Sequence, residues 1–155
     1  MAKKPDFDLQ AAHKYFSAEC FNRAWDYIDK PGRSTSEGDG MLQLSMASLW
    51  HWTQREDCTP TNLSIGYWQV SRAYALLRQA DQARHYGQLC LEASQAEGVE
   101  PFYRGEAYEA LARAELVADN QDAMEKYLIQ AHQVATALTD AEEKKMLLKD
   151  LASVR

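Results

Sequence analysis

The chain has 155 residues, of which 46% are hydrophobic and 26% charged, and its net charge at neutral pH is −6. A globular chain of this length buries roughly 68 to 70% of the surface that its unfolded form exposes, so it forms a core without disulfides or metal. Nucleic-acid binding is disfavoured, because residues 78–155 carry 14 acidic against 9 basic side chains and offer no basic field to a phosphate backbone.

Cysteine usage and the absence of long apolar stretches bear on the compartment. Cys20, Cys58 and Cys90 are an odd number without CxxC spacing, which argues against a disulfide framework and a zinc knuckle. No apolar segment follows the basic pair Lys3-Lys4, and no stretch approaches the roughly 20 apolar residues that span a bilayer. We therefore expect a cytoplasmic protein.

The four prolines divide the chain into long blocks with helical periodicity. Apolar residues between 8 and 29 recur at spacings of three and four, the stripe of a helix packed on one side. Similar patterns predict helices over 41–54, 60–79, 81–96 and 101–118, a sixth that follows the turn at 119–122 and reaches 138, and a seventh over 140–154. Strand patterns are absent. The sequence predicts an all-α chain with seven helices in antiparallel αα-hairpins.

Local signals mark where these helices begin. The segment 30–40, rich in glycine and serine, reads as the longest loop of the chain. Thr59 is expected to cap a helix whose first residue is Pro60, and Asp81 to cap the following one. Thr139 and Glu142 have the spacing of a capping box.

An internal repeat appears when the sequence is compared with itself at an offset of 41 residues. Each unit is a helix, a short turn and a second helix, which is the sequence signature of an αα-hairpin repeat. Identical pairs are Tyr67 and Tyr108, Arg72 and Arg113, Ala73 and Ala114, Asp81 and Asp122, and Tyr86 and Tyr127.

These residues resemble the tetratricopeptide repeat family. The positions that match its pattern of aromatic and small residues are Tyr67, Ser71, Tyr74, Ala83 and Cys90 in the first unit, and Tyr108, Ala112 and Ala131 in the second. The chain departs from the family in its offset of 41 rather than 34 and in Met124, which stands where alanine is expected. The resemblance covers about residues 64–138 and implies a right-handed stack of helix pairs. On this resemblance, residues 1–155 are a single helical-repeat domain. It consists of a divergent N-terminal helix pair (1–60), two repeat units (61–98 and 100–138) and a capping helix (139–155).

Catalytic and nucleotide-binding motifs are absent: there is no GxGxxG, Walker loop, GxSxG or HExxH. Asp81 and His85 are the only acid and histidine at i,i+4 spacing, and a helix start with an exposed histidine explains them better than a metal site. We expect no metal, no cofactor and no catalytic residue.

The tryptophans gather in the first half of the chain, between positions 25 and 68. If the first three helices pack side by side, their inner faces form either a ligand pocket with aromatic walls or a core with satisfied polar edges. The candidate ligand-binding residues are His13, Glu19, Asn22, Trp25, His51, Trp52, Asn62, Trp68, Ser71 and Arg72.

An enzymatic site is a further alternative. His13 or His51, oriented by Glu19, would make a general base. His13 and Glu19 lie on different faces of one helix, because six residues correspond to 240° around it, so this site requires a contact between helices.

Acidic side chains are frequent between residues 100 and 125: Glu100, Glu106, Glu109, Glu115, Asp119, Asp122 and Glu125. We expect a solvated helix face. The alternative is an acidic groove that attracts a basic peptide.

The last predicted helix places Leu147, Leu148, Leu151 and Val154 on one stripe. Such a helix covers the apolar end of a helical stack, or it pairs with a second copy in a homodimer.

The functional expectation is a non-enzymatic binding protein that holds a protein or peptide partner against the helix pairs, by analogy with the fold. The alternative is a small-molecule or enzymatic pocket built on the aromatic first half.

Overall fold

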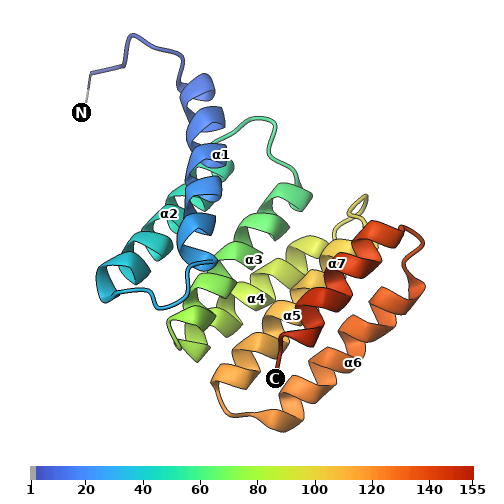
Figure 1. Cartoon of the computed structure of the whole chain (residues 1–155). Helices are drawn as coiled ribbons and strands as arrows, with labels where there is room; N and C mark the ends of the chain where they lie inside the picture. Colours follow the sequence, from blue (N-terminus) through green and yellow to red (C-terminus); the bar gives the residue numbers. More distant parts are fainter. Residues whose placement is uncertain (1–2) are drawn as a thin grey trace.

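The computed structural model describes residues 3–155, which form seven α-helices and no strand (Figure 1). The helices are α1 (Leu9–Ile28), α2 (Thr35–Thr53), α3 (Pro60–Leu76), α4 (Ala80–Ser94), α5 (Pro101–Val117), α6 (Gln121–Ala137) and α7 (Ala141–Ala152). The prediction of an all-α chain with seven helices is confirmed for this part of the chain. Among these helices, none combines the length and the apolar character needed to cross a membrane.

Each helix packs against the next one in the chain, and the odd-numbered helices also touch one another. Helix α1 contacts α3, α3 contacts α5, and α5 contacts α7, which lies across the end of the molecule opposite α1 and α2 (Figure 1). The odd-numbered helices thus lie in series, and side chains that face the same way from α1, α3, α5 and α7 share one surface.

The two units of the sequence repeat have the same local geometry. The turns α3–α4 and α5–α6 each contain one residue with positive φ, Arg78 at 59° and Asp119 at 54°, which are 41 positions apart. Between the helices of each pair, two tyrosine rings meet. The ring centres of Tyr67 and Tyr86 are 6.3 Å apart, and those of Tyr108 and Tyr127 are 6.4 Å apart. The 41-residue offset is therefore a structural repeat of these contacts.

The expectation of a long loop over residues 30–40 is wrong. Helix α2 begins at Thr35 because Ser34 and Glu37 form a capping box, in which the Ser34 hydroxyl accepts from the Glu37 N–H and the Glu37 carboxylate accepts from the Ser34 N–H. Gly38 lies inside this helix, and its bare backbone packs against Leu77. A Cβ at this position would come within 2.8 Å of Leu77 Cδ2. Gly38 therefore serves close packing rather than a loop.

Two other helix starts also differ from the sequence prediction. Helix α4 begins at Ala80 without a side-chain cap, so Asp81 lies in its first turn and pairs with Arg84 instead. Helix α7 is capped by Asp140, which accepts from the N–H groups of the next helical residues, and not by the hydroxyl of Thr139. The predicted cap at Thr59 is confirmed, with Asn62 as its reciprocal partner.

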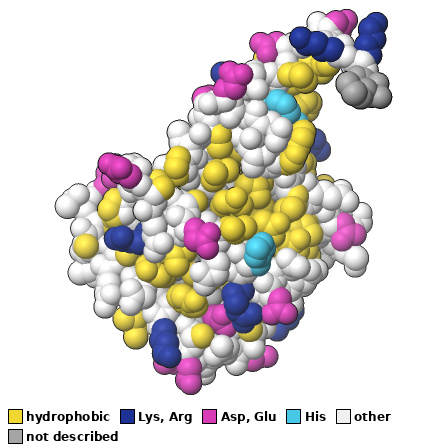
Figure 2. Space-filling model, turned by 180° about the vertical axis from the view of Figure 1, so that it is seen from behind, with side chains coloured by type: hydrophobic (Ala, Val, Ile, Leu, Met, Phe, Trp, Pro, Cys, Tyr) yellow, Lys and Arg dark blue, Asp and Glu magenta, His cyan; other side chains and the backbone are white. Residues whose placement is uncertain are grey.

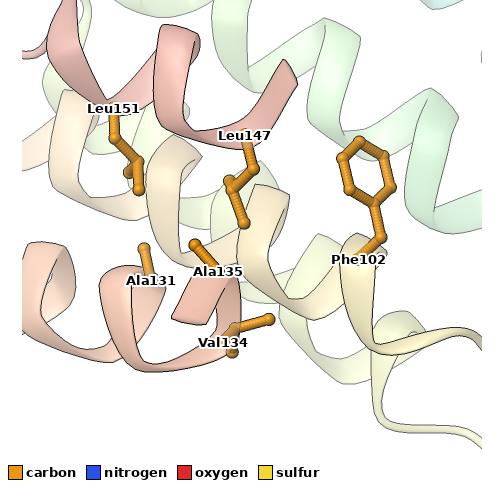
Figure 3. Close-up of a cluster of buried hydrophobic side chains, with 6 residues drawn as sticks. All are labelled: Phe102, Ala131, Val134, Ala135, Leu147 and Leu151. Carbon is orange, nitrogen blue, oxygen red and sulfur yellow. The ribbon is translucent and has the colours of Figure 1, made fainter. Parts of the chain in front are cut away.

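A buried apolar cluster joins α5, α6 and α7 (Figure 3). Leu147 and Leu151 reach from α7 onto the small side chains of Ala131 and Ala135 on α6, while Phe102 lies on α5 at the edge of the cluster. Leu148, predicted to share the apolar stripe of α7, is 39% exposed, because α7 buries only the side that carries Leu147 and Leu151. This cluster fixes α7 against the stack.

Candidate binding site

An open pocket of about 520 Å³ lies where α1, α3, α5 and α7 meet. Its wall is mainly apolar and comes from all four helices: Phe21, Trp25, Ile65, Trp68, Phe102, Tyr103 and Met146. Charged side chains complete the lining: Asp29, Arg72, Glu106, Lys149 and Asp150. The mixture of apolar walls and a few polar groups is typical of a ligand site.

Two tryptophans form the side of the pocket that α1 and α3 contribute. The rings of Trp25 and Trp68 stack with 5.7 Å between centres and 30° between planes. The Arg72 guanidinium lies 5.4 Å from the centre of the Trp68 ring, a cation–π distance. Both rings are half-buried and line the cavity.

Behind this wall, Glu109 organises a buried network of charges. It accepts a hydrogen bond from the Trp68 indole N–H at 3.0 Å and another from the Nε–H of Arg113 at 2.7 Å. Arg72 approaches it at 3.8 Å and reaches Asp150 on α7 at 4.0 Å. A carboxylate that is almost fully buried is tolerated because these donors replace its hydration.

Glu106, one turn before Glu109 on α5, is buried without such partners. It is 8% exposed and lines the pocket, and its Oε1 has no hydrogen-bond partner among residues 3–155. Burial, with the neighbouring charges of Glu109 and Asp150, raises the pKa of Glu106 to about 9, although Arg72 and Arg113 oppose the shift. Glu106 is therefore protonated at neutral pH.

The sequence predicted that the acidic residues between positions 100 and 125 form a solvated helix face. This prediction is wrong for three of them. Glu106, Glu109 and Glu115 are all buried. Glu109 is held by the network above, and Glu115 receives two hydrogen bonds from Arg84, at 2.6 and 3.0 Å. Helix α5 buries nearly its whole circumference because α3, α4, α6 and α7 all contact it. The carboxyl groups of Glu106, Glu109 and Glu115 therefore face other helices and not water.

The structure divides the candidate ligand-binding residues among several places. Trp25, Trp68 and Arg72 line the pocket. Asn22, Trp52 and Asn62 line a smaller cavity of about 170 Å³, which shares the pocket's residues Phe21 and Ile65.

Two of the residues in the smaller cavity have structural partners. The guanidinium of Arg55 lies 3.7 Å from the centre of the Trp52 ring. The Asn62 side-chain oxygen accepts from the Thr59 N–H as part of the α3 cap. These contacts occupy one face of Trp52 and the acceptor of Asn62.

The remaining candidates lie outside both cavities. His13 and His51 contact each other, with 2.8 Å between their Nδ1 atoms, so one Nδ1–H donates to the other ring. Within residues 3–155, no hydrogen bond joins either histidine to the half-buried Glu19. Ser71 is buried and donates to the carbonyl of Ala83 at 2.8 Å, a contact between α3 and α4.

Sequence reasoning missed the half of the pocket that α5 and α7 contribute, including Phe102, Glu106 and Asp150. The available signal was the repeat itself. Glu109 is the residue that stands 41 positions after Trp68, and Arg113 stands 41 after Arg72, so consecutive repeats place a tryptophan and an arginine beside an acid and an arginine. The acidic residues of α5 could thus have been predicted to lie in the interior between consecutive repeats.

The described residues show no metal cluster, and one face of the molecule carries an apolar patch. Among residues 3–155, no group of three or more histidine, cysteine, aspartate or glutamate side chains is arranged to hold a metal ion. A hydrophobic patch lies on the side opposite the view of Figure 1, with charged side chains mostly toward its margins (Figure 2).

The chain matches no known family model, no curated protein and no solved structure.

Proposed function

We propose that the chain is a binding protein that holds a peptide segment of a protein partner in the pocket between α1, α3, α5 and α7. The observation that carries this proposal is the stacked pair Trp25 and Trp68 beside an apolar cavity that opens to solvent. Aromatic side chains with a ring face available are the usual anchors of protein and peptide interfaces.

The proposal includes a tetratricopeptide-like right-handed stack of antiparallel helix pairs. The repeated positive-φ turns and the repeated tyrosine contacts, each separated by 41 residues, support it. In such a stack the first helices of successive pairs share one surface on which an extended segment lies. The pocket is built from α1, α3 and α5 in that way, with α7 closing its end.

A small-molecule ligand is the second candidate. The cavity of about 520 Å³ falls within the usual range for small-molecule sites, about 300 to 1,000 Å³. The peptide is preferred because Met146, at the edge of the pocket, is 55% exposed. A partner larger than the cavity covers such a rim residue, whereas a ligand enclosed by the cavity leaves it in water.

The test is a selection of random linear peptides on the immobilised full chain, followed by affinity measurements with two matched variants. Met146→Asp places a charge on the pocket rim, and Leu148→Asp places one at an exposed leucine of the same helix that does not line the pocket. We expect Met146→Asp to weaken the selected peptides about tenfold or more through loss of apolar contact. Leu148→Asp is expected to leave affinity unchanged.

Two results would overturn the proposal. One is a selection that enriches no peptide above the background of a blocked support. The other is a set of peptides whose affinities respond equally to Met146→Asp and Leu148→Asp, because binding is then elsewhere on the molecule.

A further inference from the structure

We propose that the pocket accepts a lysine or arginine side chain of the bound peptide, with its charged end between Glu106 and Asp150. The aliphatic stem of that side chain lies against the stacked tryptophans. This inference names the chemistry of the ligand and rests on the proposed function above.

The charged side chains around the cavity bear on which ligand it accepts. Its lining contains three carboxyl groups and two cationic groups: Asp29, Glu106 and Asp150 against Arg72 and Lys149. Glu109 and Arg113, which lie behind the lining, hydrogen-bond to each other and add no net charge. Lys149 is solvent-exposed on α7, so the interior of the pocket has Arg72 as its lining cation. Asp29 is exposed as well, so the charges of the interior are those of Arg72 and Asp150, and the interior becomes negative overall when Glu106 loses its proton.

The two nearby arginines, Arg72 and Arg113, already have other partners than Glu106. Arg113 binds Glu109 and also donates to the Ser153 hydroxyl at 2.8 Å. Arg72 lies over the Trp68 ring and between Glu109 and Asp150, at 3.8 and 4.0 Å. Neither arginine forms an ion pair with Glu106. The Oε1 atom of Glu106 is a buried polar atom in the pocket wall without a hydrogen-bond partner, so it has an acceptor site open to a ligand.

The aromatic walls of the pocket also favour a basic side chain. Lysine and arginine side chains combine an apolar stem with a charged end, so they fit a site where an aromatic surface leads to carboxyl groups. Trp25 and Trp68 supply that surface, and a cation near their faces gains further from the ring quadrupoles.

An anionic ligand fits the same cavity poorly, although the Nε–H of Arg72 also lacks a partner. An incoming carboxylate or phosphate would meet the negative charges of Asp29 and Asp150 in the same wall. The free Nε–H is suited to a neutral acceptor, such as a backbone carbonyl of the peptide that carries the basic side chain.

A bound cation changes the protonation of the pocket. In the free protein Glu106 holds a proton because of burial and the charges of Glu109 and Asp150. The other charged groups around the site are Arg72 on α3, Arg113 on α5, Lys149 on α7 and Asp29 at the end of α1. An ammonium or guanidinium group beside Glu106 displaces that proton into solvent. Because Glu106 then binds as a carboxylate, affinity is expected to rise about tenfold for each unit by which the pH increases toward the pKa of Glu106.

The experiment uses the peptides selected on the full chain. Each basic residue is replaced by an uncharged analogue of similar shape, norleucine for lysine and citrulline for arginine, and affinities are measured for the wild type and for Glu106→Gln. Glutamine resembles the protonated carboxyl group, so this variant retains the neutral form that Glu106 has in the free protein. Glu97→Gln, at an exposed position between α4 and α5, is the matched control.

We expect one basic residue whose replacement weakens binding about tenfold to hundredfold in the wild type, and much less in Glu106→Gln. Glu97→Gln is expected to behave as wild type. If the peptides lose affinity on Met146→Asp but bind equally well with uncharged analogues, the basic side chain is refuted and the peptide site stands. If no peptide is enriched, both proposals fail.

Discussion

Trp68 donates its indole N–H to Glu109, the residue that occupies the corresponding position one repeat later, at 3.0 Å. The bond joins α3 to α5 and ties one wall of the pocket to the buried charges behind it. Trp68 therefore has two roles, since its ring lines the cavity and its N–H satisfies a buried carboxylate.

The first prediction concerns this bond. Trp68→Phe keeps an aromatic ring but leaves Glu109 with one donor fewer, so we expect the free energy of unfolding to fall by about 1 to 3 kcal/mol. Urea denaturation at neutral pH measures it. Trp25→Phe is the control, because Trp25 stacks on Trp68 without a role in the Glu109 network, and it is expected to cost less. Equal losses in the two variants would contradict this account of Trp68.

The second prediction concerns Glu106 and pH. Its pKa is about 9 in the folded chain and near 4.5 when unfolded, so the folded state binds the extra proton between these values. Stability from this group is complete below about pH 4.5 and is lost as the pH rises toward about 9. Glu106→Gln removes the effect, and we expect it to exceed the wild type by about 1 to 3 kcal/mol at pH 8 while matching it near pH 5.

Urea denaturation across that pH range tests this prediction, with Glu97→Gln as the surface control. Burial and the charge of Glu109 raise the pKa of Asp150 as well. This group also makes stability fall with rising pH, equally in the wild type and in Glu106→Gln. Parallel stability curves for the wild type and Glu106→Gln would show that Glu106 does not take up a proton on folding.

The third prediction concerns His13 and His51. Burial, with the adjacent charge of His13, lowers the pKa of His51 below its ordinary value. The unfolded chain therefore takes up a proton that the folded chain resists, and stability is retained above about pH 6.5 and lost as the pH falls below it. Protonation of the ring that accepts at Nδ1 also breaks the Nδ1 to Nδ1 hydrogen bond, which is worth on the order of 1 kcal/mol.

His51→Gln is expected to flatten the fall in stability between about pH 7 and about pH 5, as measured by thermal unfolding. His132→Gln, at an exposed position on α6, serves as the comparison and is expected to retain the wild-type slope. A slope that His51→Gln leaves unchanged would assign the acid sensitivity to other groups.

The fourth prediction tests the start of α2. Gly40 lies inside the helix, where an added Cβ would come no closer than 3.5 Å to the Tyr27 ring, an ordinary contact. Gly40→Ala is therefore expected to stabilise the protein by about 0.5 to 1 kcal/mol. Gly38→Ala gains less or loses, because its Cβ would meet Leu77 at 2.8 Å. No gain in the melting temperature of Gly40→Ala would favour the loop that composition alone suggests for this segment.

The sequence was sufficient for helix number and type, because apolar periodicity and proline positions are local signals. It failed where distant contacts decide. Gly38 lies within α2, where Leu77, the residue that follows α3, occupies the space that a side chain would need. Glu106 and Glu109 look like surface residues in a chain of net charge −6, and only the packing of four helices around α5 places them inside. Half of the aromatic pocket could be predicted, since Trp25, Trp68 and Arg72 stood out by composition. The half from α5 and α7 could not, because it depends on how α7 closes the stack.

The most direct measurement of the central claim is the number of protons released when a selected peptide binds. Calorimetry at pH 7 in two buffers of different ionisation enthalpy gives this number for the wild type and for Glu106→Gln. Since Glu106 holds a proton in the free pocket and releases it into solvent when a cationic side chain binds beside it, close to one proton is expected for the wild type and close to none for the variant. Tight binding to the wild type without proton release would contradict the claim that a cation occupies the site beside Glu106.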